Sequence, residues 1–320
     1  MEEKIFLERK TIYDGIREAC DVTNDHGIFF NIPIRKEIFQ KLQTAFVEYI
    51  HKCLESYYGD KLFLHDWRFA KKDFSLLNVY ENEIFNLPNI TPGGILKVKK
   101  EIDNEFNKIQ SIVTDILIET GLINCISHGQ YIVPRIKSGK VSLDERLRPM
   151  STEKYHSDAW ASQKGDAILS IPVGGDTTTT VEFCKPKGIT KSFFNSLIDY
   201  DDAIEQVYFK ELDFIDFAKF REINIFDHLC VHRTLKQNGG LRVSLEIGFA
   251  AVSEHSLIHE SKNRIHESYR NEYVNQKDLR LLGKDIFVTT DETMKDAERY
   301  RKNPGQRQYA EIKLVRNKNV

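Results

Sequence analysis

The sequence lacks any apolar run that approaches the ~20 residues with which a helix crosses a membrane. It also lacks an excess of one charge, because its formal net charge at pH 7 is only −2. A near-neutral chain disfavours a nucleic-acid partner and an anionic membrane surface. The first ten residues are charged throughout, unlike a secretory signal peptide, so no removable leader is expected.

Cysteine is scarce and scattered. The chain has five cysteines, an odd number, and none are in a CxxC spacing. This pattern indicates reduced thiols rather than a disulfide framework or a zinc ribbon, so we expect a cytoplasmic protein. The cysteines are Cys20, Cys53, Cys125, Cys184 and Cys230.

The first part of the chain predicts helices. Apolar residues fall at three- and four-residue steps over residues 33–58 and again over residues 95–119. Pro33 is expected in the first turn of the earlier helix, and Gly59 and Gly121 are expected to stop the two helices. Both segments look amphipathic, so each should pack one face against an apolar surface.

From about residue 129 the pattern changes to short strands rich in Val, Ile, Thr and aromatic residues, which indicate an antiparallel sandwich or barrel. After residue 254 the chain is highly charged and predicts helices and loops outside the β core. We therefore expect one domain with a helical part (1–128), a β core (129–252) and a charged extension (253–320). The predicted strands are 131–133, 167–173, 177–183, 206–214, 224–231 and 241–252.

Three residues form a candidate metal site. His156 and Asp158 are two apart, so on a strand they project to the same face and can reach one ion. His232 follows a second predicted strand. Two neutral imidazoles and one carboxylate on one side of a metal form the facial triad of non-haem iron(II) oxygenases, with the opposite positions open.

A second pair follows ten residues after His232. Arg242 and Ser244 are again two apart and share a strand face. A guanidinium offers a planar fork of donors that matches a carboxylate, and a hydroxyl adds one more bond. We expect a hairpin through Gly239-Gly240 to bring Arg242 back beside the strand of His232.

Together, His156-x-Asp158, His232 and Arg242-x-Ser244 resemble the signature of the Fe(II)/2-oxoglutarate-dependent dioxygenase superfamily. The helical first half and the turn after His232 look more like the phytanoyl-CoA dioxygenase-like branch than the JmjC branch. The resemblance covers roughly residues 130–252.

The resemblance implies a mainly β fold with helical additions. Its core would be a double-stranded β-helix, that is, a cupin-like jelly roll, with the helical N-terminal half packed on it. It implies a hydroxylase-type enzyme that uses Fe(II), O2 and 2-oxoglutarate, releases succinate and CO2, and oxidises a C–H bond. Related halogenases have a small residue at the carboxylate position, so Asp158 favours hydroxylation over halogenation. The expected substrate is a small polar metabolite or biosynthetic intermediate.

Other positions are candidate substrate contacts. Trp160 shares the predicted face of the metal dyad, and Arg148 and Arg135 lie upstream of it. Glu246 continues the face of Arg242 and Ser244, and a carboxylate there needs a cationic or hydroxyl partner.

Different roles remain open at this point. The histidines and Arg242 could serve only as core and ion-pair residues. The chain could be a non-catalytic cupin-like binding module, or an oxygenase that modifies a protein or RNA. The intact ligand set disfavours the module, and the near-neutral charge disfavours RNA.

Overall fold

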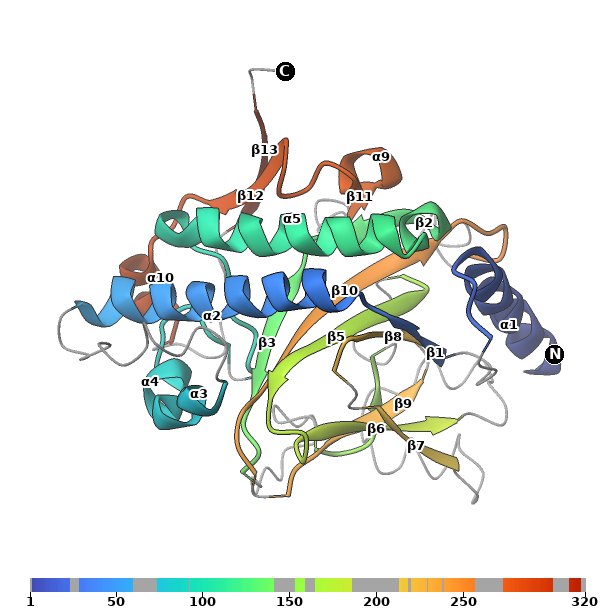
Figure 1. The fold of residues 1–320 in the computed structure, drawn as a ribbon, viewed down its shortest axis with the longest axis horizontal. Helices are drawn as coiled ribbons and strands as arrows, with labels where there is room; N and C mark the ends of the chain where they lie inside the picture. The colour runs from blue at the N-terminus through green and yellow to red at the C-terminus, as the bar shows by residue number, and fades with distance from the viewer. Residues whose placement is uncertain are drawn as a thin grey trace.

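Two larger antiparallel sheets, a two-stranded sheet and a layer of helices make up the described part of the computed structural model (Figure 1). Helices α2 (Lys36–Tyr58) and α5 (Asp103–Glu119) lie side by side over one face of the larger sheet, and the smaller sheet lies on the other side. No helix among the described residues is long and apolar enough to span a bilayer. The structure describes residues 2–23, 29–59, 74–91, 93–140, 153–158, 165–185, 213–217, 220–228, 230–237, 239–256, 273–301 and 311–317.

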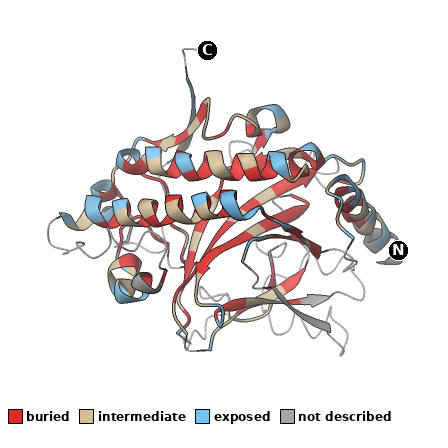
Figure 2. Ribbon diagram, in the orientation of Figure 1, coloured by how far each residue is buried: buried red, intermediate tan, exposed pale blue. Residues whose placement is uncertain are grey.

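The two long helices confirm the amphipathic segments, with different first residues. Pro33 is the last residue of strand β1 (Phe29–Pro33), and α2 begins three residues later. A sequence window cannot separate these two uses of proline, because proline is tolerated both at strand edges and in first helical turns. Gly59 and Gly121 both have positive φ (57° and 76°), which confirms them as stop residues. Both helices show alternating buried and exposed stripes (Figure 2).

The larger sheet has the order β1-β8-β5-β10-β2-β11, and β3 also pairs with β10. Pro134 lies within β3. Among the described strands β3 pairs with β10 alone, which fits the expected edge position of this proline. The bounds of its further strands are β2 Ile126–Gln130, β3 Val133–Lys137, β5 Ala167–Gly175, β8 Glu222–Asp227, β10 Arg242–Ala251 and β11 Tyr273–Asn275.

The two faces of the larger sheet differ in polarity. Along β10, Val243, Leu245 and Ile247 are fully buried and form the apolar outer face. The alternate residues Arg242 and Glu246 project to the inner face and line a cavity. Hydrophobic burial therefore joins this sheet to the helices, and its inner face is left for polar chemistry.

The smaller sheet has the order β4-β9-β6-β7 and faces the larger one. The ring of Phe183 in β6 packs against Phe29 and Phe226 of the larger sheet, with centroid distances of 5.9 and 4.6 Å. The predicted strand 224–231 is in fact split between the two sheets as β8 and β9. The bounds are β4 His156–Ser157, β6 Thr180–Lys185, β7 Asp213–Phe217 and β9 Val231–Leu235.

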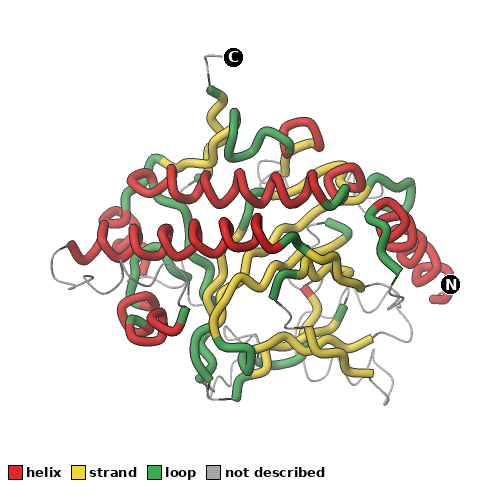
Figure 3. Tube along the Cα trace, viewed as in Figure 1, coloured by secondary structure: helices red, strands yellow, loops and turns green. Residues whose placement is uncertain are grey.

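Both ends of the chain add strands, as the tube in Figure 3 makes plain. β1 pairs with β8 although it belongs to the predicted helical part. β11 pairs with β2, and β12 (Ile286–Thr290) pairs with β13 (Ile312–Arg316). The prediction of only helices and loops after residue 254 is wrong for these segments, because they are short, half-exposed strands whose apolar signal is weak. The architecture is a mixture of helices and antiparallel sheets.

The remaining helices are short, apart from α1, which packs beside the 3-10 turn Leu122–Cys125. They are α1 Glu2–Ala19, α3 Ser75–Val79, α4 Glu81–Phe85, α9 Gln276–Leu279 and α10 Met294–Arg301, with a further 3-10 turn at Lys100–Ile102.

Candidate metal centre

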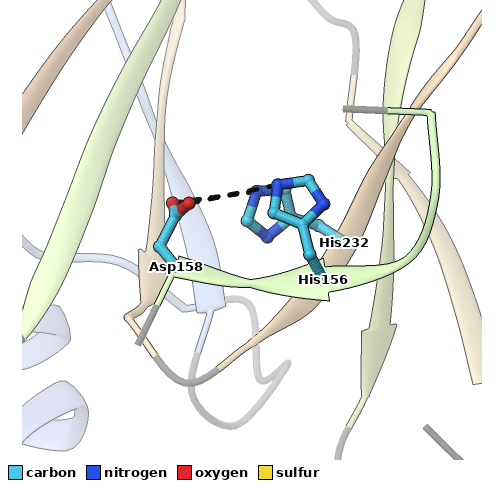
Figure 4. Close-up of side chains that lie close together, drawn as sticks. All are labelled: His156, Asp158 and His232. Carbon is cyan, nitrogen blue, oxygen red and sulfur yellow. Dashed lines mark ion pairs between the residues drawn. The ribbon is translucent and has the colours of Figure 1, made fainter. Parts of the chain in front are cut away.

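The two histidines of the predicted triad face one another across a strand pair. His156 in β4 is the direct cross-strand partner of His232 in β9, and their ring centroids are 4.4 Å apart. Directly opposed residues of an antiparallel pair point to the same side of a sheet. Both rings therefore project to the same side, toward Asp158 (Figure 4).

Asp158 completes the group from the end of β4. Its carboxylate oxygens lie 4.0 Å from His156 Nε2 and 3.8 Å from His232 Nε2. One ligand atom from each of the three residues lies within 4.8 Å of the others, a spacing that can surround one ion. It is the single cluster of this kind in the described part of the chain. The structure thus brings together the three residues that the sequence predicted.

Backbone carbonyls hold both rings in one orientation. His156 Nδ1 donates to the carbonyl oxygen of Lys154 (2.9 Å), and His232 Nδ1 donates to that of Cys230 (3.2 Å). In each case Nε2 keeps its lone pair and faces the carboxylate. Anchoring the second ring nitrogen in this way is the usual arrangement for metal-binding histidines.

The charge states of the group suit a divalent cation. Burial, and next the proximity of His232, lowers the pKa of His156 to about 3, so its ring is neutral at pH 7. Burial alone would raise the pKa of Asp158, but the neighbouring imidazoles and Arg135 lower it, leaving the pKa at about 2. A neutral imidazole and an ionised carboxylate are the forms that bind metals.

Arg242 lies on the opposite wall of the same space, and Ser244 is two residues further along the same strand. The cavity between the sheets is lined by all three members of the triad and by Arg242. Arg242 and Ser244 are 5% and 1% exposed, and Arg242 Nε and Ser244 Oγ are buried with no hydrogen-bond partner. Within the described residues no carboxylate forms an ion pair with Arg242, and burial lowers the pKa of this guanidinium to about 10. Unused buried donors of this kind indicate an anion site.

The predicted hairpin after His232 is wrong. Among the described residues no ladder joins β9 to β10, because the two strands belong to different sheets. Gly240 N donates to Asp176 Oδ2 and Leu241 N donates to Asn78 Oδ1, both at 2.7 Å. These hydrogen bonds hold the segment between β9 and β10 against the turn after β5 and against α3. The chain passes from the smaller sheet to the larger one along this segment. Arg242 therefore faces His232 across the cavity rather than along one sheet.

Two more polar residues line this inner face. Glu246 forms an ion pair with Arg135 (Nη2 to Oε2, 2.6 Å), so it has the cationic partner that its predicted inward position requires. Lys137, which sequence reasoning missed, is 6% exposed and lies directly opposite Arg242 in the β3–β10 ladder. Its signal in the sequence is only its two-residue step from Arg135. Trp160 and Arg148 lie outside the described residues, so their predicted roles stay predictions.

A network of buried hydrogen bonds and ion pairs holds strand β4, which carries His156, in place. Ser157 Oγ donates to the carbonyl oxygen of His228 (3.1 Å), and His228 N donates to that of Asp166 (3.1 Å). Arg9 of α1 bonds both Asp166 Oδ1 and Asp227 Oδ2 at 2.8 Å. Helix α1 therefore helps to hold the segment against which β4 is fixed.

Comparison with known proteins finds distant structural similarity only. The carbocyclase SnoK of nogalamycin biosynthesis, described as non-haem and α-ketoglutarate-dependent, aligns at a TM-score of 0.34 and 9% identity, over 45% of this chain and 60% of its own. AviO1 from Streptomyces viridochromogenes aligns at 0.38 and 9%, over 68% and 87%. A prolyl 4-hydroxylase from Phytophthora capsici aligns at 0.33 and 13%, over 86% and 76%.

This chain thus spans less than two thirds of the carbocyclase. No protein-family model and no curated protein sequence matches it. At these scores the similarity is not an argument for a particular activity, which has to come from the site itself.

Proposed function

We propose that this chain is an Fe(II)- and 2-oxoglutarate-dependent oxygenase. It would hydroxylate or otherwise oxidise a C–H bond of a small polar metabolite, with release of succinate and CO2. The two facing sheets would be the jelly-roll core of such an enzyme. The phytanoyl-CoA dioxygenase-like branch and a cytoplasmic location belong to the same proposal.

One observation carries the proposal. A triad of His156, Asp158 and His232 and an unpaired buried arginine line the same cavity from opposite sheets. A ligand that satisfies both needs a metal-chelating end and a separate carboxylate. 2-Oxoglutarate has this form, because its oxoacid end can chelate a metal while its far carboxylate remains free.

Each sheet would bind a different part of the ligand set, the smaller sheet the metal and the larger sheet the far carboxylate. The Nε2 atoms of His156 and His232 and one oxygen of Asp158 would hold Fe(II) from one side, leaving the other positions open. The fork of Arg242 would bind the far carboxylate, and Ser244 Oγ would donate a further hydrogen bond. The bound iron supplies the activation of O2 that C–H oxidation requires. Phe183 and Phe226, packed within 5.5 Å of the His232 ring centroid, form an apolar wall that limits access of water to the triad.

The direct test is spectroscopic. Anaerobic Fe(II) with 2-oxoglutarate should give the wild-type chain a weak visible charge-transfer band, and admission of air should yield succinate. His156→Ala and Asp158→Ala should lose both signals. His255→Ala is the matched control, because His255 also faces a carboxylate, Glu254, at 3.6 Å but does not line the cavity.

Two outcomes would contradict the proposal. If the wild-type chain binds metal but gives neither the band nor succinate, it is a binding module rather than an oxygenase. If Arg242→Met leaves 2-oxoglutarate affinity unchanged, the far carboxylate binds elsewhere.

A further inference from the structure

A second, larger cavity meets the metal-site cavity. It has a volume of about 220 Å³, and Arg135, Asp158 and Glu246 line both spaces. Because one metal ligand belongs to both, a molecule at the junction lies beside the triad. The volume is below the ~300–1,000 Å³ typical of sites for drug-sized ligands, so it suits a compact metabolite.

Away from the junction, the larger cavity is lined by buried apolar side chains together with polar residues such as Lys97 and Gln130. Leu96 and Val98 come from the segment before α5, Phe106 from α5 and Ile168 from β5, and all four are buried. The apolar part of this lining favours an aliphatic or aromatic group.

The junction holds charges of both signs. Arg135 and Glu246 form their ion pair there, and their side chains are 22% and 23% exposed, so neither is sealed from the cavity. Arg135 Nε is buried without a hydrogen-bond partner, so this guanidinium has a donor left for a ligand. The pair thus offers an acceptor for a cation and a donor for an anion within one small area.

We propose that the substrate oxidised at this site is a zwitterion of the α-amino-acid type with an apolar side chain. Its carboxylate binds Arg135, its ammonium group binds Glu246, and its side chain occupies the larger cavity. This inference rests on the proposed function and names the substrate class of that site.

The charge pattern is the reason for choosing a zwitterion. A ligand with a single charge would compete for one partner of the pair and leave the other poorly compensated in a low-dielectric space. A ligand with both charges satisfies both partners at once. The fork geometry of a guanidinium further favours a carboxylate as the anionic group.

Binding to the full chain loaded with Mn(II) and 2-oxoglutarate, measured by calorimetry without O2, tests the inference. The probes are leucine, methionine and phenylalanine, each compared with its deaminated acid and its decarboxylated amine. We expect at least one amino acid to bind tenfold or more tightly than both of its analogues. Glu246→Gln should reduce the preference over the deaminated acid to less than threefold, and Arg135→Gln should do the same for the preference over the amine.

Glu292→Gln is the matched control, because Glu292 is also partly buried and paired with a lysine, Lys99, but lines neither cavity. It should keep the full preference. Thermal unfolding of each variant shows whether it is folded, and the preferences of the two variants are compared with those of the wild type and of this control. Equal binding of amino acids and analogues, a preference unchanged in Glu246→Gln, or no binding by any probe would overturn the inference.

Separate titrations of 2-oxoglutarate and of the amino acids distinguish a failure of this inference from a failure of the proposed function. If 2-oxoglutarate binds the loaded protein but no amino acid does, only the substrate class is wrong. If amino acids bind with the expected preference but 2-oxoglutarate does not, the oxygenase proposal fails and the zwitterion site remains.

Discussion

Arg242 lies directly opposite Lys137 in the β3–β10 ladder, so a buried guanidinium and a buried lysine amine share one level of the inner face. Directly opposed like charges destabilise a sheet pair. Burial lowers the pKa of Lys137 well below its usual value, and nearby Arg135 and Arg242 lower it further. An anion bound at this level would favour the charged forms of both side chains.

Arg242→Met should therefore affect the free and the ligand-bound protein differently. In the absence of ligand, the free energy of unfolding should change by less than about 1 kcal/mol, because an unpaired buried charge is replaced by an apolar chain. The stabilisation by 2-oxoglutarate, about 2.7 kcal/mol at a ligand concentration of 100 Kd in the wild type, should be lost. Urea unfolding with and without ligand measures both. Arg233→Met, which removes an arginine paired with Glu182 outside the cavity, should keep the ligand effect.

The metal-free protein should lose stability in mild acid. The pKa of His156 is about 3 when folded and 6.5 in its ordinary state, so the unfolded chain binds more protons between these values. Stability therefore falls as pH is lowered from about 6.5 toward 3, by on the order of 1.5 kcal/mol between pH 6.5 and 5. The lowered pKa of Asp158 extends the same trend below pH 4, from its ordinary 3.8 toward about 2. Urea unfolding in the presence of a chelator should show this slope in the wild type and a reduced slope in His156→Gln; equal slopes would contradict the assignment.

Arg9→Met should destabilise the whole fold. Arg9 is 2% exposed and pairs with Asp166 and Asp227, both fully buried, so its loss leaves two carboxylates without their cation. Breaking a buried pair in this way costs about 3–5 kcal/mol. The surface pair of Arg35 and Glu119 provides the comparison, and Arg35→Met should cost less than about 1 kcal/mol. The denaturant concentrations at the unfolding midpoint, compared at an unchanged m-value, measure both losses of stability. Similar losses for Arg9→Met and Arg35→Met would show that the buried network contributes little.

Gly94→Ala should loosen strand β3. Gly94 has φ +80°, and a Cβ there would lie 1.9 Å from the carbonyl oxygen of Ile136. The backbone around Gly94 also bonds the edge of β3 that faces away from β10, since Ile136 N donates to Gly94 O at 2.8 Å. We expect a loss above about 2 kcal/mol. Gly15→Ala, in helix α1 with nothing near its Cβ, should instead stabilise by about 0.5–1 kcal/mol in thermal unfolding.

The metal triad could be predicted because its rules are local. A step of two places His156 and Asp158 on one face of any strand, and the same step places Arg242, Ser244 and Glu246 in one row. The structure brings the three candidate ligands together, and Arg242 and Glu246 line the same cavity. The stop residues of the helices follow equally local rules, since a glycine with positive φ ends a helix wherever it occurs.

Long-range pairing could not be predicted. Arg135 and Lys137 reach the cavity only because β3 pairs with β10 in one register, and no local pattern specifies a partner about a hundred residues away. The hairpin rule failed after His232 for a similar reason. The side chains of Asp176 and Asn78, distant in sequence, hold the intervening glycines and direct the chain to the other sheet.

The placement of the candidate metal ligands and of Arg242 on different sheets affects how the two sheets would move relative to one another. All three metal-binding candidates belong to the smaller sheet or its end, and Arg242 and Ser244 belong to the larger one. A cosubstrate held at both ends would cross-link two layers that also meet through aromatic rings around Phe183. Amide hydrogens of β6 and β9 would then exchange with solvent more slowly once the cosubstrate is bound, while those beneath α2 and α5 would hardly change.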